Sequence, residues 1–175
     1  NKPGLYEFPL GKNLQELIYH EAGGIRNGKK LKAVIPGGSS VPVLRADEID
    51  VAMDFDALAG RGSMLGSAGV IVMDEDTCMV NALLNLETFY SHESCGQCTP
   101  CREGTMWMKK ILSRIEHGQG RPEDLPLLED IARHIQGRTI CPLGDAAAMP
   151  AASFLKQFRQ EFVEHIEQKK CPHSK

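Results

Sequence analysis

The residues best suited to chemistry in this sequence of 175 residues are its cysteines. Three of the six lie within seven positions, in the order C-x2-C-x2-C, and a fourth precedes a proline 40 residues later. These four are Cys95, Cys98, Cys101 and Cys141. A cubane 4Fe-4S cluster requires four thiolates, and three from one loop with a fourth from a distant Cys-Pro turn is a common source of them. The spacing therefore favours one 4Fe-4S cluster on these residues, with electron transfer as its function.

Structural zinc is the alternative for the same thiolates. Zinc also takes four of them, but its usual spacing is two C-x2-4-C pairs rather than a triplet and a single cysteine. His92 is a further possible ligand, although a lone histidine is more often an ordinary surface or core residue. We interpret Cys78, at an expected helix start, and Cys171, in a polar tail, as bystanders. No base is placed in the sequence to activate a catalytic thiol, which disfavours a nucleophilic enzyme.

Positive groups are expected around the four cysteines, because a cubane with four thiolates is an anion. One helix is expected to begin just after Cys101 and another just after Cys141, so that their N-terminal N–H groups face the cluster. Arg102 and Arg138 add positive charge nearby. Such groups stabilise the reduced state and raise the reduction potential.

Composition excludes several other functions. The net charge is -3, without the basic stripe that nucleic-acid binding needs. No apolar run approaches the ~20 residues of a membrane span, so we expect no direct membrane insertion. No signal peptide is visible, and clustered cysteines favour metal over disulfides, which indicates a cytoplasmic location. The glycine-rich residues 60–66 lack the spacing and lysine of a nucleotide loop. Because the sequence begins at Asn1 without methionine, we expect it to be part of a larger protein.

Residues 1–76 have the pattern of a small sheet with one helix across it. A helix is expected from Asn13, a capping residue, to Gly23 and Gly24. Short apolar runs predict strands. The run at residues 41–44 is a weaker, edge-strand candidate, because Pro42 has no N–H to donate to a neighbouring strand. The predicted strands are residues 5–8, 31–35, 41–44 and 70–73. This order, in too few residues for a doubly wound sheet, predicts a β-grasp (ubiquitin-like) domain.

Residues 77–175 are predicted to form a helical domain that carries the cluster. Apolar side chains recur at helical spacing in four segments, which is typical of a helix-bundle core. The first helix is expected to be capped by Thr77, the second to begin near Arg102 and the third at Pro122. The fourth is expected over residues 151–168. The fold class is thus α+β, with a β-grasp domain followed by an all-α helical bundle.

Three segments resemble a known family, the flavin-bearing F subunit of NADH-quinone oxidoreductase, respiratory complex I. Residues 93–105, ESCGQCTPCREGT, are similar to its cluster loop, and residues 137–147, GRTICPLGDAA, to its fourth-ligand turn. Residues 32–40, KAVIPGGSS, resemble the β-grasp module that precedes the cluster domain. The resemblance covers essentially the whole chain, and the same modules occur in diaphorase subunits of hydrogenases and NAD-dependent formate dehydrogenases.

The resemblance implies a role in NADH dehydrogenase activity. In the family, NADH reduces FMN, and FMN passes single electrons through this 4Fe-4S cluster toward quinone. Nothing here resembles the N-terminal FMN- and NADH-binding domain, so we expect a C-terminal part that binds neither FMN nor NAD and is not catalytic alone. Its implied partners are that N-terminal domain and other peripheral-arm subunits of complex I, in the cytoplasm beside the inner membrane. An equivalent diaphorase subunit and a zinc-stabilised interaction module are the competing hypotheses.

Overall fold

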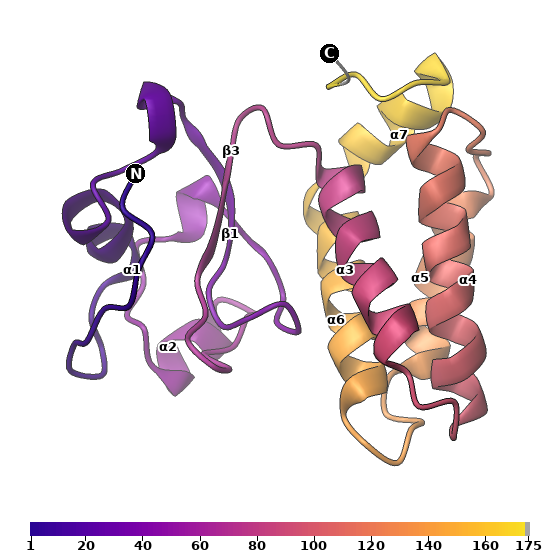
Figure 1. Cartoon of the computed structure of the whole chain (residues 1–175), viewed down its shortest axis with the longest axis horizontal. Helices are drawn as coiled ribbons and strands as arrows, with labels where there is room; N and C mark the ends of the chain where they lie inside the picture. The colour runs from indigo at the N-terminus through magenta and orange to yellow at the C-terminus, as the bar shows by residue number, and fades with distance from the viewer. Residues whose placement is uncertain (174–175) are drawn as a thin grey trace. The chain divides into compact units, whose positions relative to one another are not determined.

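The chain folds as two compact units, residues 1–77 and residues 78–175 (Figure 1). This computed structural model describes residues 1–173, and the last two residues of the predicted helical domain lie outside the described residues. A small sheet occupies the first unit and helices form the second. The predicted α+β class, with a sheet half followed by a helical half, is confirmed.

The first unit contains a three-stranded antiparallel sheet. Its central strand, β1 (Leu31–Ile35), pairs with β2 (Leu44–Arg45) on one side and with β3 (Ile71–Asp74) on the other. Side chains from the sheet and from the helical segments share one apolar core, which includes Leu14, Val34 and Leu58. The helical segments are α1 (Leu14–Glu16), η1 (Leu17–Glu21), η2 (Arg26–Gly28), η3 (Ala46–Glu48) and α2 (Phe55–Gly60).

Two of the predicted strands differ from the structure. Residues 5–8 form no strand, because no neighbouring strand pairs with them, and Leu5 is fully exposed. Of residues 41–44, only Leu44 enters a strand, since Pro42 has no N–H to donate to a ladder. The predicted cap at Asn13 is confirmed: its side-chain oxygen accepts the N–H groups of Gln15 and Glu16 at 2.9 and 3.2 Å.

Four helices of the second unit form a bundle, with a fifth packed against it. Helices α3 (Met79–Glu93) and α5 (Asp124–Ile135) each pack against both α4 (Thr99–Glu116) and α6 (Leu143–Gln157). The last helix, α7 (Arg159–Gln168), contacts α3, α4 and α6. The predicted apolar stripes meet in the core, and its largest fully buried side chains include Leu83, Met108, Leu112, Leu128, Phe154 and Phe162.

The observed helix boundaries differ from three of the predicted ones. Cys78, not Thr77, caps α3, and its Sγ accepts the N–H of Asn81 at 3.3 Å. The second helix begins at Thr99 rather than near Arg102, because Pro100 is tolerated in a first turn. The expected helix over residues 151–168 is two helices separated at Phe158, whose φ of -124° leaves the helical region.

None of the helices within residues 1–173 is both long enough and apolar enough to cross a bilayer.

Candidate metal centre

The loop between α3 and α4 presents three of the four predicted ligands. Cys95 is exposed in the loop, Cys98 is half-buried at the N-cap of α4, and Cys101 is buried in the first turn of that helix. Gly96 turns the loop with a φ of +79°, a conformation that glycine adopts without strain. Because residues three apart at a helix start lie on the same side, Cys98 and Cys101 share one face of the α4 terminus.

The loop between α5 and α6 presents the fourth predicted ligand, Cys141. Cys141 is exposed immediately before the first turn of α6. The hydroxyl of Thr139 donates to the carbonyl of Cys141 at 2.9 Å, and the N–H of Gly137 donates to the Asp145 carboxylate at 2.6 Å. The first hydrogen bond lies within the loop and the second joins the loop to α6. Together they hold Cys141 in place through neighbouring residues of the chain.

A hydrogen bond connects the two loops at one end of the bundle. The backbone N–H of Ile140 donates to the Sγ of Cys98 at 3.4 Å. In Figure 1 the loops lie at the same end, where α3 ends and where α4 and α6 begin. The structure thus brings the neighbour of Cys141 against Cys98, although 42 residues separate the bonded pair.

Hydrogen-bond donors and helix termini surround these sulfur atoms. The Oγ of Ser94 lies 3.2 Å from the Sγ of Cys101, within hydrogen-bonding distance. Two helices begin here: α6 at Leu143, just after Cys141 as predicted, and α4 at Thr99, two residues before Cys101 rather than after it. The unpaired N–H groups of their first turns are suited to a negative group.

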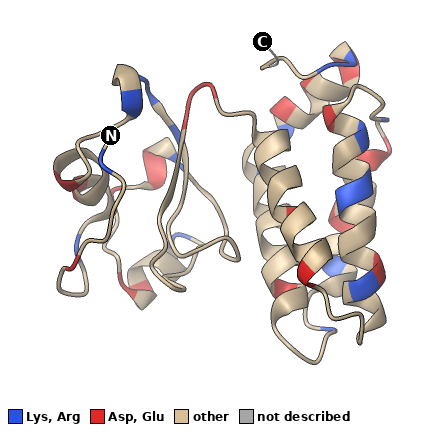
Figure 2. Ribbon diagram, viewed as in Figure 1, with Lys and Arg blue, Asp and Glu red and all other residues tan. Residues whose placement is uncertain are grey.

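One of the two predicted arginines, Arg102, makes a contact that holds the cysteine loop. Arg102 donates to the carbonyl of Gly96 at 2.8 Å, which holds the cysteine loop, but its Nε also pairs with Glu103 at 2.9 Å. Arg138 is exposed. Figure 2 shows Lys and Arg interspersed with Asp and Glu over the helices of this unit. The helix termini and the local hydrogen bonds therefore act together with these arginines in stabilising an anion.

The donor set fits a group that takes four thiolates. All four cysteines are free thiols, carried on two loops that a hydrogen bond joins. A cluster of iron and sulfide needs this kind of ligand set and benefits from N–H donors toward its sulfurs. His92, the other ligand considered from the sequence, has an exposed side chain whose Nδ1 lies 2.9 Å from Glu93.

Cys78 and Cys171, predicted to be bystanders of the cluster, lie together in the structure. Their Sγ atoms lie 3.6 Å apart, and Cys171, expected in a polar tail, is buried. His165 and Glu116 complete a four-residue group around them. The only signal in the sequence is the spacing His-x5-Cys at the end of an amphipathic helix, which is too weak to indicate a site by itself.

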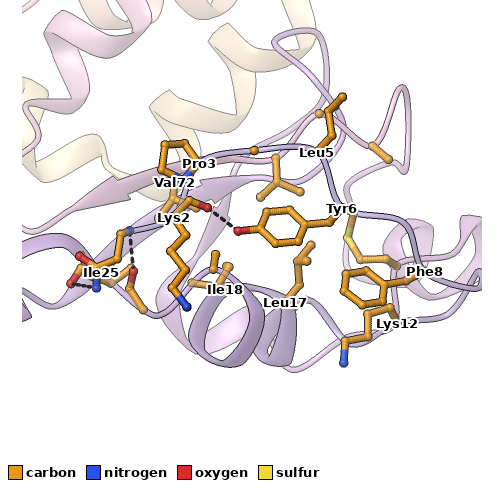
Figure 3. A pocket seen from close by; sticks show the side chains of 18 of the residues that line it. Lys2, Pro3, Leu5, Tyr6, Phe8, Lys12, Leu17, Ile18, Ile25 and Val72 are labelled. Atoms are coloured by element: carbon orange, nitrogen blue, oxygen red, sulfur yellow. Dashed lines mark hydrogen bonds between the residues drawn. The ribbon is translucent and has the colours of Figure 1, made fainter.

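A separate apolar groove of about 1070 Å³ lies in the first unit. The N-terminal segment forms one wall, where the Tyr6 hydroxyl donates to the carbonyl of Lys2 (Figure 3). Leu17 and Ile18 lie opposite, and the ring of Phe8 stacks 6.3 Å from that of Tyr6. The groove has no cysteine or histidine in its described lining, which suits contact with another apolar surface better than chemistry.

Comparisons with known proteins match the segment that carries these four cysteines. The family model for the NADH-ubiquinone oxidoreductase-F iron-sulfur binding region matches residues 81–165. The F 2 subunit of the NADH-quinone oxidoreductase of Rhizobium meliloti is 56% identical over 98% of this chain and 41% of its own length. The F subunit of the Mycobacterium tuberculosis enzyme is 48% identical over 98% of this chain and 38% of its own length. The chain thus spans about two fifths of these relatives.

A solved structure shows the same fold. The NAD+-reducing NiFe hydrogenase in its H2-reduced state superposes with a TM-score of 0.81 and 29% sequence identity. The match covers 99% of this chain and 28% of that chain. Both units described above are therefore found, with the same topology, within a much longer redox protein.

Proposed function

From the premise that this chain corresponds to the C-terminal region of the F subunit of NADH-quinone oxidoreductase, we propose that it relays single electrons. The chain carries the iron-sulfur binding region of that family. We propose that Cys95, Cys98, Cys101 and Cys141 hold one 4Fe-4S cluster there. The hydrogen bond from Ile140 to Cys98 carries the proposal, because it brings the loop of Cys141 against the loop of the other three. When bound, such a cluster supplies reversible one-electron transfer at a potential set by its surroundings.

Residues of the chain set that potential. Ser94 and the N–H of Ile140 place hydrogen bonds on two of the sulfurs, and each bond stabilises added negative charge. The α4 and α6 termini act in the same direction through their free N–H groups. Arg102 keeps the loop closed by its bond to Gly96. All these contributions favour the reduced state, as an electron acceptor requires.

Exposure of the ligands indicates the side on which electrons are exchanged. Cys101 is buried against the bundle, whereas Cys95 and Cys141 are exposed. The exposed side can approach a neighbouring redox group, while the buried side is insulated by helices. In the whole protein we propose that FMN, reduced by NADH in another domain, donates electrons here, and that further peripheral-arm subunits of complex I carry them toward quinone.

The remaining finer assignments follow from the same proposal. The whole protein is proposed to reside in the cytoplasm, peripheral to the inner membrane and attached through other subunits. We propose that residues 1–76 act as the β-grasp (SLBB-type) domain and residues 77–175 as the cluster domain. The exposed apolar residues Leu5, Tyr6, Phe8 and Leu10 border the groove of the first unit and offer a contact surface for a partner domain or subunit.

A second candidate is the equivalent diaphorase subunit of a hydrogenase. The superposition on the NAD+-reducing NiFe hydrogenase favours it, since that protein carries the same pair of units. The sequence identity of 56% to a complex I subunit, against 29% to the hydrogenase, favours the respiratory enzyme. Both candidates assign a one-electron relay to this chain. They differ in the direction of flow, because an NAD+-reducing enzyme passes electrons to NAD+, whereas an NADH-quinone oxidoreductase takes them from NADH.

An anaerobic redox titration tests the relay. We expect the purified chain to be brown and to take up one electron reversibly, with a low-temperature paramagnetic resonance signal in the reduced state. Replacing any one of the four cysteines with serine should diminish that signal, whereas Cys171→Ser should retain it. A colourless chain that takes up no electron after anaerobic reconstitution with iron and sulfide would refute the proposal.

A further inference from the structure

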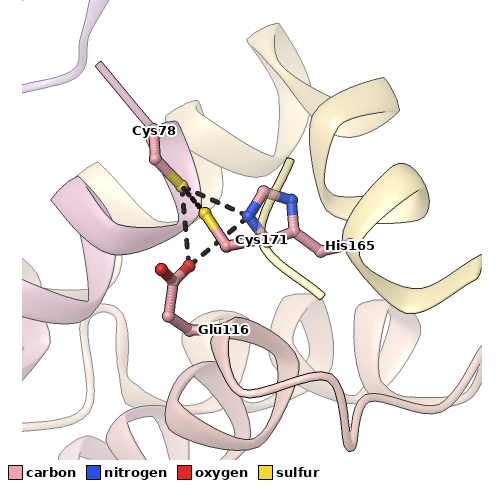
Figure 4. A group of neighbouring side chains, drawn as sticks. All are labelled: Cys78, Glu116, His165 and Cys171. Atoms are coloured by element: carbon pink, nitrogen blue, oxygen red, sulfur yellow. Dashed lines mark hydrogen bonds and ion pairs between the residues drawn. The ribbon is translucent and has the colours of Figure 1, made fainter. Parts of the chain in front are cut away.

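A second group of side chains of the metal-ligating types Cys, His and Glu lies in the helical unit, outside the proposed cluster site. Cys78, Glu116, His165 and Cys171 each offer one ligand atom, and these atoms all lie within 4.8 Å of one another. They come from the start of α3, the end of α4, the last turn of α7 and the segment after α7. Figure 4 shows the four side chains pointing toward one another.

Four of the six separations between these atoms lie within about 0.2 Å of the ranges expected for tetrahedral zinc. The Sγ of Cys78 lies 3.6 Å from the Sγ of Cys171, 3.2 Å from the Nε2 of His165 and 3.5 Å from the Oε2 of Glu116. The nitrogen and that oxygen are 3.4 Å apart. Zinc bonds of about 2.3 Å to sulfur and about 2.0–2.1 Å to nitrogen and oxygen require separations of about 3.8 Å for two sulfurs and about 3.3–3.6 Å for the other pairs.

A backbone contact sets which ring nitrogen of His165 is protonated. The Nδ1 of His165 lies 2.7 Å from the carbonyl oxygen of Glu161. A carbonyl only accepts hydrogen bonds, so Nδ1 carries the proton and Nε2 presents its lone pair to the group. Metal-binding histidines characteristically have such a partner on the other ring nitrogen. His165 is also fully buried, so water does not compete for Nε2.

Asn81 orients two of the other ligands. Its side-chain amide donates to the Oε1 of Glu116 at 3.2 Å, which leaves Oε2 directed at the other three atoms. Its backbone N–H donates to the Sγ of Cys78 at 3.3 Å. Hydrogen bonds of this kind orient metal ligands and stabilise their charged forms. Three of the four ligand atoms therefore already have supporting contacts that a metal site would need.

The chain turns at this end of the bundle hold the group together. Gly118, just after α4, has a φ of +73°, and a Cβ there would overlap the carbonyl oxygen of Lys169. The absence of a side chain lets the turn after α4 pack directly on the turn after α7. That contact brings Glu116, two residues before the glycine, beside Cys171, two residues after the lysine.

We propose that Cys78, Glu116, His165 and Cys171 bind one Zn²⁺ in a closed, structural site. Four protein ligands leave no position for a substrate, which distinguishes structural from catalytic zinc. Binding removes the thiol protons of both cysteines to solvent and changes no oxidation state. The ion would fasten the C-terminal segment to α3, α4 and α7. The 15 residues of α3 separate it from the cysteine loops by about 22 Å, so the two sites are distinct.

Metal analysis of the full chain tests this site. Protein purified anaerobically with added Zn²⁺ should contain one zinc per chain, besides any iron. X-ray absorption at the zinc edge should show two sulfur and two nitrogen or oxygen neighbours. Cys171→Ser and His165→Gln should each lose the zinc. His134→Gln, at an exposed histidine of α5, should retain it.

Two further measurements guard against misfolded variants. Chelation of zinc from the wild-type chain should lower its melting temperature, and this result does not depend on any substitution. Iron content in Cys171→Ser should stay at the wild-type value, which shows that the cluster end remains folded. The proposal is overturned if the wild-type chain binds no zinc under reducing conditions, if zinc persists in both ligand variants, or if a Cys78–Cys171 disulfide forms instead and excludes the metal.

Discussion

The backbone N–H of Ile140 donates to the Sγ of Cys98 across 3.4 Å, between residues on two separate loops of the helical bundle. The side chain of Ile140 is almost fully exposed, so its contribution to this contact comes from the main chain. The contact places the loop of Cys141 against the first turn of α4, where Cys98 and Cys101 are carried. This junction is essential to the proposed site, because a cubane needs a fourth thiolate beside the three of the first loop.

Replacing Cys98 with alanine should abolish cluster binding and destabilise residues 91–150, since metal binding and folding are coupled. Iron per chain should fall from about four to near zero. Hydrogen exchange should show lost protection at the start of α4 and α6 first. Cys171→Ala serves as the control, because it removes a buried thiol from the other end of the unit and should leave iron unchanged. Unchanged iron in Cys98→Ala would contradict the ligand assignment.

Replacing Ser94 with alanine should lower the reduction potential without loss of iron. The Ser94 hydroxyl is within hydrogen-bonding distance of the Cys101 sulfur, and hydrogen bonds to ligand sulfur favour the reduced state. Potentiometric titration of the purified variant measures the change. Ser91→Ala, one turn earlier on α3, is the matched control and should keep the wild-type potential. An equal potential in both variants would show that the Ser94 contact does not act on the cluster.

Replacing Glu87 with glutamine should remove a pH dependence of stability. Glu87 is fully buried, and within residues 1–173 neither carboxylate oxygen has a hydrogen-bond partner. Burial raises the pKa of this carboxyl well above its usual value. Between the unfolded and folded pKa values the folded chain binds the extra proton, so wild-type stability falls as pH rises above about 4.5, by at most about 1.4 kcal/mol per pH unit.

Urea unfolding of the helical unit at several pH values checks the effect of Glu87. Glu87→Gln should match the wild type near pH 4 and exceed it at neutral pH, because the amide has no proton to lose. Glu167→Gln, an exposed position on α7, should follow the wild-type curve throughout. Parallel curves for wild type and Glu87→Gln would show that the carboxyl does not titrate in this range.

Replacing Gly118 with alanine should destabilise the helical unit more than the same change at Gly137. Both glycines follow a helix with φ near +70°, which costs alanine about 1–2 kcal/mol. A Cβ at Gly118 also meets the Lys169 carbonyl, whereas one at Gly137 meets nothing within 4 Å. The overlap should add about 1–3 kcal/mol. Thermal unfolding of the two variants compares these costs, and equal values would argue against the close contact between the two turns.

The sequence was sufficient for features that depend on local pattern. The capping residue Asn13, the apolar stripes of the helices and the spacing of the cysteine triplet each involve neighbours a few residues apart. Such patterns follow from helix and loop geometry alone. The α+β class and the start of a helix just after Cys141 followed from them. Helix boundaries were predicted less accurately: a helix was expected from residue 151, yet α6 begins at Leu143 and continues through Pro150.

Contacts between distant segments could not be predicted. The buried Glu87 lies on a helix face where an apolar residue is expected, so no periodic pattern reveals it. Cys78 and Cys171 are 93 residues apart, and only the packing of α7 against α3 and α4 brings their sulfurs together. The same holds for the contact of Ile140 with Cys98. Tertiary packing determines these positions, and the local pattern of one sequence does not show which distant segments pack together.

The most direct test of the account is a count of iron, acid-labile sulfide and zinc per chain on anaerobically purified, reconstituted protein. A cluster on Cys95, Cys98, Cys101 and Cys141 predicts about four iron and about four sulfide. Zinc, if bound at the second group, adds one more ion and does not displace iron. A chain that holds zinc but neither iron nor sulfide, even after reconstitution, would contradict the electron-relay function and support a zinc-stabilised structural module instead.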